Sequence, residues 1–269
     1  NEPFREPIAK LGKKITDRIP QKLGLKKITR NDPEYWGLAG VLTDEEALLA
    51  LKLGVRKPKT LSEIVKISGL EEKKCEALLE EMSRKGLLEY NWENDAHEKQ
   101  YVLPMFVPGC AEFMMMNDKQ VEEHPILADF FENMSRLPLE KVTPMVPPGG
   151  SGIGMHVIPV EKAIDAESKS IDLEHISYWL KKYEGHISAG ICSCRASRAV
   201  LGDGCTDDFD DWCIQLGDMA DYTVETGRAH YITKERALEI LELAEKNGYV
   251  HQITNIDGEN KIFGICNCA

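Results

Sequence analysis

Residues 43–86 have the sequence TDEEALLALKLGVRKPKTLSEIVKISGLEEKKCEALLEEMSRKG, and this stretch decides the fold of the first half of the chain. Thr43-Asp-Glu-Glu46 and Thr60-Leu-Ser-Glu63 are capping boxes. In each, a threonine hydroxyl and a glutamate three residues later satisfy the free N–H groups at a helix start. The first box predicts a helix through Leu53, and the second predicts a short helix that ends near Gly69.

A third helix is predicted over residues 71–85, because apolar side chains recur there at helical spacing and Gly86 supplies a stop. Residues 87–90 and 99–106 flank a polar turn and predict a β-hairpin. Three helices followed by a hairpin resemble a winged helix-turn-helix domain, which we assign to residues 41–107. The third helix carries five carboxylates against four cations, a poor surface for a phosphate backbone. We therefore expect this domain to contact protein, with DNA binding as the alternative.

The chain before this domain, residues 1–40, forms a basic arm. Residues 1–30 hold nine Lys or Arg against three Asp or Glu, whereas the whole chain has a formal charge of −12. The arm contains apolar residues at helical spacing, namely Ile8, Leu11, Ile15 and Ile19. They predict a short amphipathic helix that packs on the body of the protein or on another subunit of a homo-oligomer.

Residues 108–150 are assigned to a helix over 126–134 and a linker rich in proline and glycine. The glycines of 150–154 follow prolines and precede a strand pattern, so they indicate a joint rather than a phosphate loop. The sequence has no signal-like start and no apolar run of membrane length. We expect a cytoplasmic protein with no membrane span.

Residues 151–269 are assigned to a cysteine-rich α+β domain. Six of the eight cysteines of the chain lie in this part: Cys192, Cys194, Cys205, Cys213, Cys266 and Cys268. Strands are predicted over 155–160 and in a closing hairpin, 249–254 with 261–268, and helices over 171–183 and 233–247. Eight Asp or Glu and no Lys or Arg lie between residues 203 and 225, which predicts an acidic rim.

The two C-x-C pairs predict thiols that face one centre. On extended chain, residues two apart project to the same side, so Cys192 with Cys194, and Cys266 with Cys268, are expected to share a face. Cys213 is placed on a helix over 208–216. Clustered thiolates bind zinc or iron–sulfur clusters, which need several soft anionic ligands. Buried structural thiols, a disulfide framework and a thiol redox pair are the alternatives, and the sequence does not choose among the sets of four cysteines.

A longer pattern carries a resemblance. Its residues are Cys192, Cys194, Arg195, Cys205, Cys213, Gly217, Gly227, Arg228, Ile232, Thr233, Lys234, Glu235, Ala237, Leu238, Ala244, Glu245, Gly248, Val250, His251, Ile265, Cys266, Asn267 and Cys268. This pattern resembles ferredoxin-type 4Fe–4S proteins and anaerobe iron–sulfur flavoprotein oxidoreductases with a cysteine-rich N-terminal region. The C-x-x-C-x-x-C-x-x-x-C ferredoxin run and the dinucleotide-binding fingerprint are missing, so catalysis by this chain alone is not expected.

The resemblance implies electron transfer through a 4Fe–4S cluster, serving a redox partner protein linked to flavin or NAD(P), in a subunit or fragment of a larger enzyme. Arg195 would donate hydrogen bonds to cluster sulfides or thiolates, or pair with the acidic rim. The alternative function is a zinc-stabilised winged-helix module for interaction or transcriptional regulation.

Overall fold

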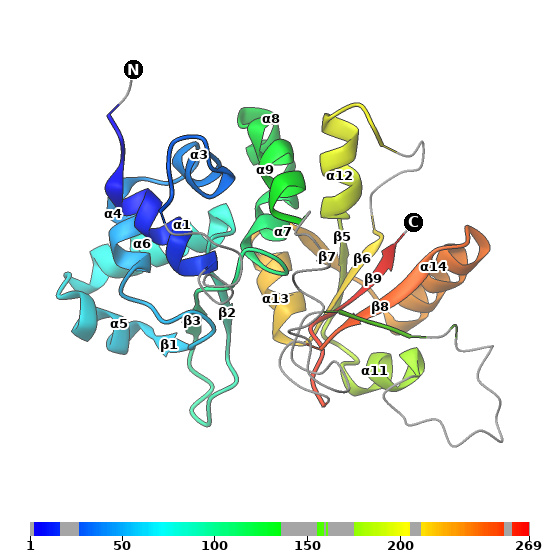
Figure 1. Ribbon diagram of the computed structural model, residues 1–269. Helices are drawn as coiled ribbons and strands as arrows, with labels where there is room; N and C mark the ends of the chain where they lie inside the picture. The colour runs from blue at the N-terminus through cyan, green and yellow to red at the C-terminus, as the bar shows by residue number, and fades with distance from the viewer. Residues whose placement is uncertain are drawn as a thin grey trace. The chain divides into compact units, whose positions relative to one another are not determined.

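The structure is a computed structural model that describes residues 3–16, 27–135, 155–158, 160, 175–204, 211–255 and 260–268. The protein has a mixed α/β fold and divides into two compact units (Figure 1). Unit 1 consists of Asn1–Pro144 and Ser193–Thr206, and unit 2 consists of Met145–Cys192 and Asp207–Ala269. Each unit is described by itself below.

Unit 1 contains nine helices in its described residues. They are α1 (Glu6–Thr16), α3 (Pro33–Ala39), α4 (Asp44–Ala50), α5 (Leu61–Ser68), α6 (Glu72–Lys85), α7 (Cys110–Met115), α8 (Asp118–Glu123), α9 (Ile126–Ser135) and α12 (Ser193–Val200). Three short antiparallel strands, β1 (Lys59–Thr60), β2 (Glu89–Asn91) and β3 (Gln100–Val102), pair in the order β1-β3-β2.

Local sequence signals set the starts of α4 and α5 as predicted, whereas α4 ends at Ala50 and not at the predicted Leu53. The Thr43 hydroxyl accepts from the Glu46 N–H, and the Glu46 carboxylate accepts from the Thr43 N–H, so α4 begins with a complete capping box. The Thr60 box at α5 is complete in the same way. Gly86 ends α6 with a φ of 88°, a left-handed conformation that glycine adopts without steric cost.

The N-terminal arm packs on the body of unit 1. Helix α1 buries Ile8, Leu11 and Ile15 and lies against α3 and α4. The Arg5 guanidinium bonds the carboxylate of Asp44 at 2.7 Å and the carbonyl oxygen of Leu42 at 2.6 Å. The predicted amphipathic helix is therefore confirmed over its described part, whereas Ile19 lies outside the described residues.

Helix α12 follows β5 in the sequence but packs in unit 1, against α7 and α9. The Glu132 carboxylate of α9 accepts from the Ser197 hydroxyl at 3.0 Å and pairs with the Arg198 guanidinium at 3.1 Å. Most of the predicted linker, from residue 136 onward, and the glycines of 150–154 lie outside the described residues.

Unit 2 is built on a six-stranded antiparallel sheet in the order β4-β8-β9-β6-β5-β7. Its strands are β4 (Met155–Val157), β5 (Ile187–Gly190), β6 (Cys213–Leu216), β7 (Ala229–Tyr231), β8 (Val250–Thr254) and β9 (Gly264–Cys268). Its described helices are α11 (Ile176–Lys182), α13 (Asp218–Glu225) and α14 (Lys234–Lys246). The structure confirms the predicted closing hairpin as β8–β9 and the predicted helix over 233–247 as α14, for which Thr233 is the N-cap.

The two faces of this sheet have different chemistry, because successive residues of a strand point to opposite sides. One face carries Ile214 and Ile265 and forms the hydrophobic core with α11 and α14, where Trp179 and Leu241 are buried. The other face is lined by α13, whose Thr223 lies 3.1 Å from the Ser188 hydroxyl. We call this second side the thiol face, because Cys213 and Cys266 alternate with the core residues.

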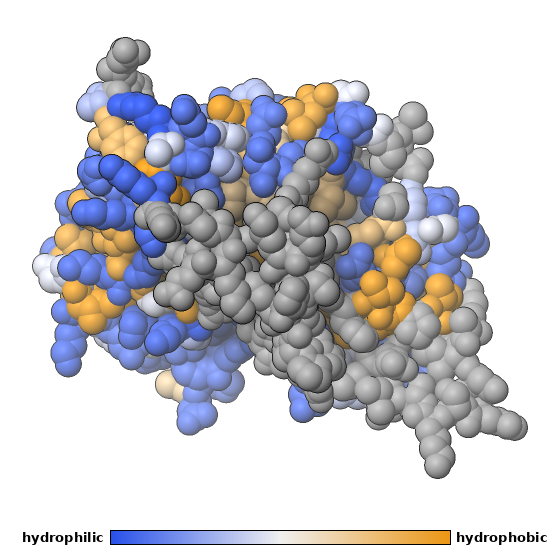
Figure 2. Space-filling model, in the orientation of Figure 1, coloured by the Kyte–Doolittle hydropathy of each residue, from blue (hydrophilic) through white to orange (hydrophobic). Residues whose placement is uncertain are grey.

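The surface mixes hydrophilic and hydrophobic residues. On the side that Figure 2 shows, the hydrophobic residues lie in separate groups, one of them over β8 and β9. Val157 on β4 and Val250 on the neighbouring strand β8 are 57% and 45% exposed. Among the described residues, no helix has both the length and the apolar character that crossing a membrane requires.

Candidate thiolate site on the sheet of unit 2

Strands β6 and β9 place Cys213 directly opposite Cys266. In the same register Leu216 lies opposite Phe263, and the Leu216 N–H donates to the Phe263 carbonyl at 3.0 Å. Hydrogen-bonded and non-hydrogen-bonded pairs alternate along an antiparallel ladder, so Cys213 and Cys266 occupy a non-hydrogen-bonded pair. At such pairs the Cα atoms approach to about 4.5 Å and the side chains are closest.

Two further thiols interact with this pair. The pKa of the Cys266 thiol is well above its usual value. The largest cause is a hydrogen bond with the Cys213 side chain, followed by burial and by repulsion from negative charge on Cys213, Cys268 and Cys192. All four cysteines are half-buried or nearly so and belong to unit 2. The fold therefore gathers four thiols from three separate segments of the chain.

The donor chemistry of this set fits a soft metal or an iron–sulfur cluster, because four thiolates are the usual ligands of both. As the side chains stand, no three His, Cys, Asp or Glu residues within the described ranges are arranged to hold a metal ion. The sulfurs of Cys213 and Cys266 instead contact one another.

The structure corrects two predictions about these cysteines. Cys213 begins strand β6 and does not lie on a helix. Cys192 and Cys194 do not lie on continuous extended chain, because β5 ends at Gly190 and Cys194 is already within helix α12. Strand alternation therefore does not place the side chains of Cys192 and Cys194 on the same face.

The remaining predicted ligands divide as follows. Cys194 is exposed and Arg195 is buried, and both lie on α12 in unit 1. Cys205 lies outside the described residues. Cys266 and Cys268, by contrast, lie two residues apart on β9 as predicted. Within unit 2 the structure brings together Cys192, Cys213, Cys266 and Cys268, a set that uses the closing hairpin.

Behind the thiols, a buried polar network fixes the end of β9. Asn267 lies between Cys266 and Cys268 and points to the opposite face of the sheet. Its amide nitrogen donates to the carbonyl oxygen of Trp212 at 3.0 Å, and its amide oxygen lies 2.7 Å from Nδ1 of His251. Because Trp212 directly precedes Cys213, the Asn267 side chain of β9 bonds the backbone at the start of β6. It thereby links the two strands that carry the opposed thiols.

A second polar network lies on the thiol face beneath α13. The Ser188 hydroxyl donates to the side-chain oxygen of Gln215 at 3.0 Å and lies 3.1 Å from the Thr223 hydroxyl. All three side chains are buried. They position α13 over the part of the sheet next to Cys213, which precedes Gln215 by two residues and lies on the same face of β6.

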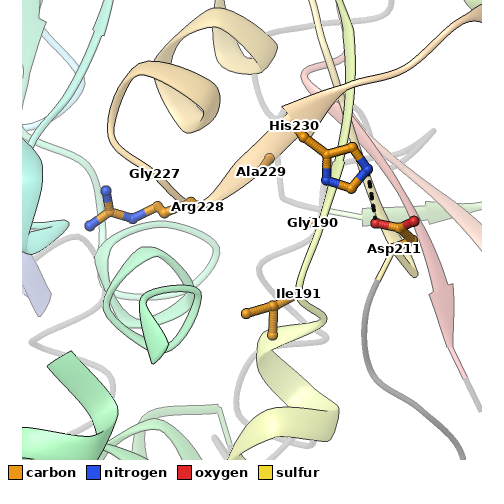
Figure 3. A pocket seen from close by; sticks show the side chains of 7 residues that line it. All are labelled: Gly190, Ile191, Asp211, Gly227, Arg228, Ala229 and His230. Carbon is orange, nitrogen blue, oxygen red and sulfur yellow. Dashed lines mark ion pairs between the residues drawn. The ribbon is translucent and has the colours of Figure 1, made fainter. Parts of the chain in front are cut away.

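A cavity of about 380 Å³ adjoins the end of β5. It is lined by Gly190, Ile191, Asp211, Gly227, Arg228, Ala229 and His230. His230 and Asp211 form an ion pair of 3.4 Å across it when the imidazole is protonated, and the Arg228 side chain points away from them (Figure 3). The cavity thus offers one imidazole and one carboxylate, and two of its lining residues, Gly190 and Ile191, immediately precede Cys192 in the sequence.

Sequence reasoning missed α13, β7, the Asn267 network and this cavity. The alternation in Ile265-Cys-Asn-Cys268 held a usable signal, because it places the asparagine on the core face, where its amide requires partners. The pairing of Cys213 with Cys266 had no local signal, since it depends on two strands that are distant in sequence.

Comparison of the chain with protein-family models, with curated proteins and with solved structures found no match. The resemblance to iron–sulfur proteins therefore stays a prediction, and the thiols themselves are the feature that indicates a function.

Proposed function

We propose that unit 2 binds an iron–sulfur cluster of the 4Fe–4S type and serves in electron transfer, with Cys192, Cys213, Cys266 and Cys268 as ligands. The observation that carries this proposal is the pair of thiols directly opposite across β6 and β9, with the thiols of Cys268 and Cys192 near enough to act electrostatically on Cys266. Bound there, the cluster would accept and release single electrons. The electrons would pass to or from a partner enzyme linked to flavin or NAD(P).

The residues of the chain supply position and environment. The β6–β9 ladder holds Cys213 and Cys266 in register, and Asn267 fixes the same two strands from behind. Helix α13 carries Asp218, Asp221 and Glu225, part of the acidic rim predicted from the sequence. Such a rim favours docking of a partner with a basic surface around its own redox centre.

The decisive test is anaerobic purification followed by iron and acid-labile sulfide analysis and a visible spectrum before and after dithionite. We expect about four irons and four sulfides per chain and bleaching on reduction. Single Cys→Ser variants then identify the ligands. Substitution at Cys213, Cys266, Cys268 or Cys192 should lower the iron content, whereas Cys194→Ser, on α12 of unit 1, is the matched control.

Two results would change the assignment. Loss of iron in Cys194→Ser with retention in Cys266→Ser would replace the sheet set by the local set that includes Cys194 and Cys205. One zinc per chain without sulfide would contradict electron transfer and indicate a structural zinc site in the same thiolates.

For unit 1 we propose a winged-helix module that contacts protein rather than DNA. The supporting observation is that three of the four cations of α6 are already paired. Lys74 pairs with Glu45, Arg84 with Glu81, and Lys85 with Glu46 at 2.7 Å. Neutralised side chains release few counterions from DNA. A duplex titration at two salt concentrations checks this proposal, and tight binding that weakens steeply with salt would contradict it.

A further inference from the structure

We infer that Cys213 and Cys266 form a reversible dithiol–disulfide pair that exchanges with low-molecular-mass disulfides such as oxidised glutathione. This activity goes beyond electron transfer through a cluster and does not require that the four thiols carry a metal. Its product would be one cross-strand disulfide between β6 and β9.

The first argument is the position of the two residues in the ladder. Cys213 and Cys266 are direct partners, and the Leu216–Phe263 hydrogen bond makes theirs a non-hydrogen-bonded pair. The Cα separation of such a pair, about 4.5 Å, lies within the range of roughly 4.4–6.8 Å that disulfides require. The backbone therefore needs no rearrangement for this bond to form.

The second argument is the contact between the side chains. The two thiols already hydrogen-bond, and as directly opposed residues they project from the same face of the sheet. The competing pair, Cys266 with Cys268, has parallel side chains on one strand. Its Cα atoms are about 6.8 Å apart, at the edge of the allowed range. The geometry thus selects Cys213 as the partner of Cys266.

The reaction balances with oxidised glutathione as the oxidant. One protein thiolate attacks a sulfur of the glutathione disulfide, forms a mixed disulfide and releases one glutathione thiolate. The second protein thiol loses its proton and attacks the protein sulfur of the mixed disulfide, which releases the second glutathione. The two cysteines are oxidised by two electrons, the glutathione disulfide is reduced, and the two thiol protons pass to the two glutathione thiolates.

The test uses the full chain and a mapping design that the sequence allows. Trypsin releases Cys213 in the peptide 199–228, which also holds Cys205, and Cys266 in the peptide 262–269, which also holds Cys268. A Cys205→Ser/Cys268→Ser double variant leaves a single thiol in each peptide. The double variant and the wild-type chain are equilibrated anaerobically in glutathione buffers with a rising fraction of oxidised glutathione. An alkylating agent then blocks the remaining free thiols, and the tryptic peptides are analysed by mass spectrometry.

We expect the two peptides to become joined with loss of two hydrogens, and to separate again on addition of dithiothreitol. Adding Cys213→Ser to the double variant should abolish the joined peptide and leave glutathione on Cys266. Free thiols, or glutathione on both cysteines without a cross-link, at every buffer ratio would overturn the inference. Circular dichroism of each variant checks that the sheet has formed.

Iron analysis of the same samples separates this inference from the proposed function. Cross-linking in a chain without iron supports the inference while the cluster proposal fails. A chain that holds iron is tested before and after the iron is removed by a chelator. Cross-linking that occurs only after chelation supports both the redox inference and the cluster proposal. An iron-free or chelated chain that does not cross-link contradicts the inference and leaves the cluster proposal to its own test.

Discussion

Nδ1 of His251 lies 2.7 Å from Oδ1 of Asn267, in a buried position between the two cysteines of the last strand. The same asparagine donates to the Trp212 carbonyl at 3.0 Å. The Asn267 amide thus bonds His251 of β8 on one side of β9 and the residue that precedes β6 on the other side. These two contacts stabilise the register of the three strands as well as the fold.

We predict that Asn267→Ala lowers the free energy of unfolding by roughly 2–4 kcal/mol, because it leaves the Trp212 carbonyl and the His251 imidazole without this partner in a buried site. Denaturant unfolding measures the loss. Asn133→Ala is the control, since its amide donates to Asp129 on an exposed helix surface and should cost less than about 0.5 kcal/mol. Equal losses in the two variants would show that the network contributes nothing.

The raised pKa of Cys266 predicts slow alkylation of its thiol at neutral pH, because only the thiolate reacts. Cys213→Ala removes the hydrogen bond and the charge that raise this pKa, so alkylation of Cys266 should accelerate at fixed pH. Timed labelling with iodoacetamide and peptide mass spectrometry provide the rates. Cys110→Ala, in the core of unit 1, should leave the rate at Cys266 unchanged.

Glu112 gives unit 1 a pH-dependent stability. Burial raises the pKa of its carboxyl to about 7, although the Gly109 N–H donates to the carboxylate at 2.7 Å. Between the unfolded pKa of 4.5 and the folded value, the folded state binds more protons. Stability is therefore fully present below about pH 4.5 and is lost as pH rises toward 7, by at most about 3 kcal/mol.

Glu112→Gln should remove this dependence, because the amide cannot ionise and its oxygen still accepts from Gly109. Thermal unfolding of both proteins from pH 4 to 8 checks the prediction. Parallel curves for the variant and the wild type would mean that the Glu112 carboxyl titrates alike in the folded and unfolded states.

Glu46 joins a helix cap to an ion pair. Its side chain is 2% exposed, accepts from the Thr43 N–H at 2.7 Å and pairs with Lys85 at 2.7 Å. Glu46→Ala should cost about 3–5 kcal/mol, because it leaves the largely buried Lys85 ammonium without its closest carboxylate. The neighbouring Glu45→Ala removes an exposed pair with Lys74 and should cost about 0–1 kcal/mol. Similar losses at the two positions would contradict this account.

How far the sequence predicted the structure depended on how local each signal was. The predicted caps at Thr43 and Thr60 lie within four residues of the N–H groups that they satisfy, and both helices begin there. The prediction that places Cys213 on a helix over 208–216 is wrong, because no local pattern marks this segment as a strand. Its strand is defined by pairing with Gly190 and Cys266, which are distant in sequence.

The candidate site shows the same limit. The pair Cys266 and Cys268 follows from alternation alone, whereas its meeting with Cys192 and Cys213 depends on strand order in the sheet. Helix α12 has buried Ser197 bonded to Glu132 and could not be assigned to unit 1 from its own sequence, because its partners lie on α7 and α9.

Trp212 and Asn267 are 55 residues apart in the sequence, and the strands that they join carry the two opposed thiols. A chain emerging from the ribosome exposes Cys192 and Cys213 well before β9 has been synthesised. Until β9 pairs with β6, these thiols are separate reactive groups without their final neighbours. The order of synthesis therefore means that Cys213 can meet Cys266 only after β9 has been translated.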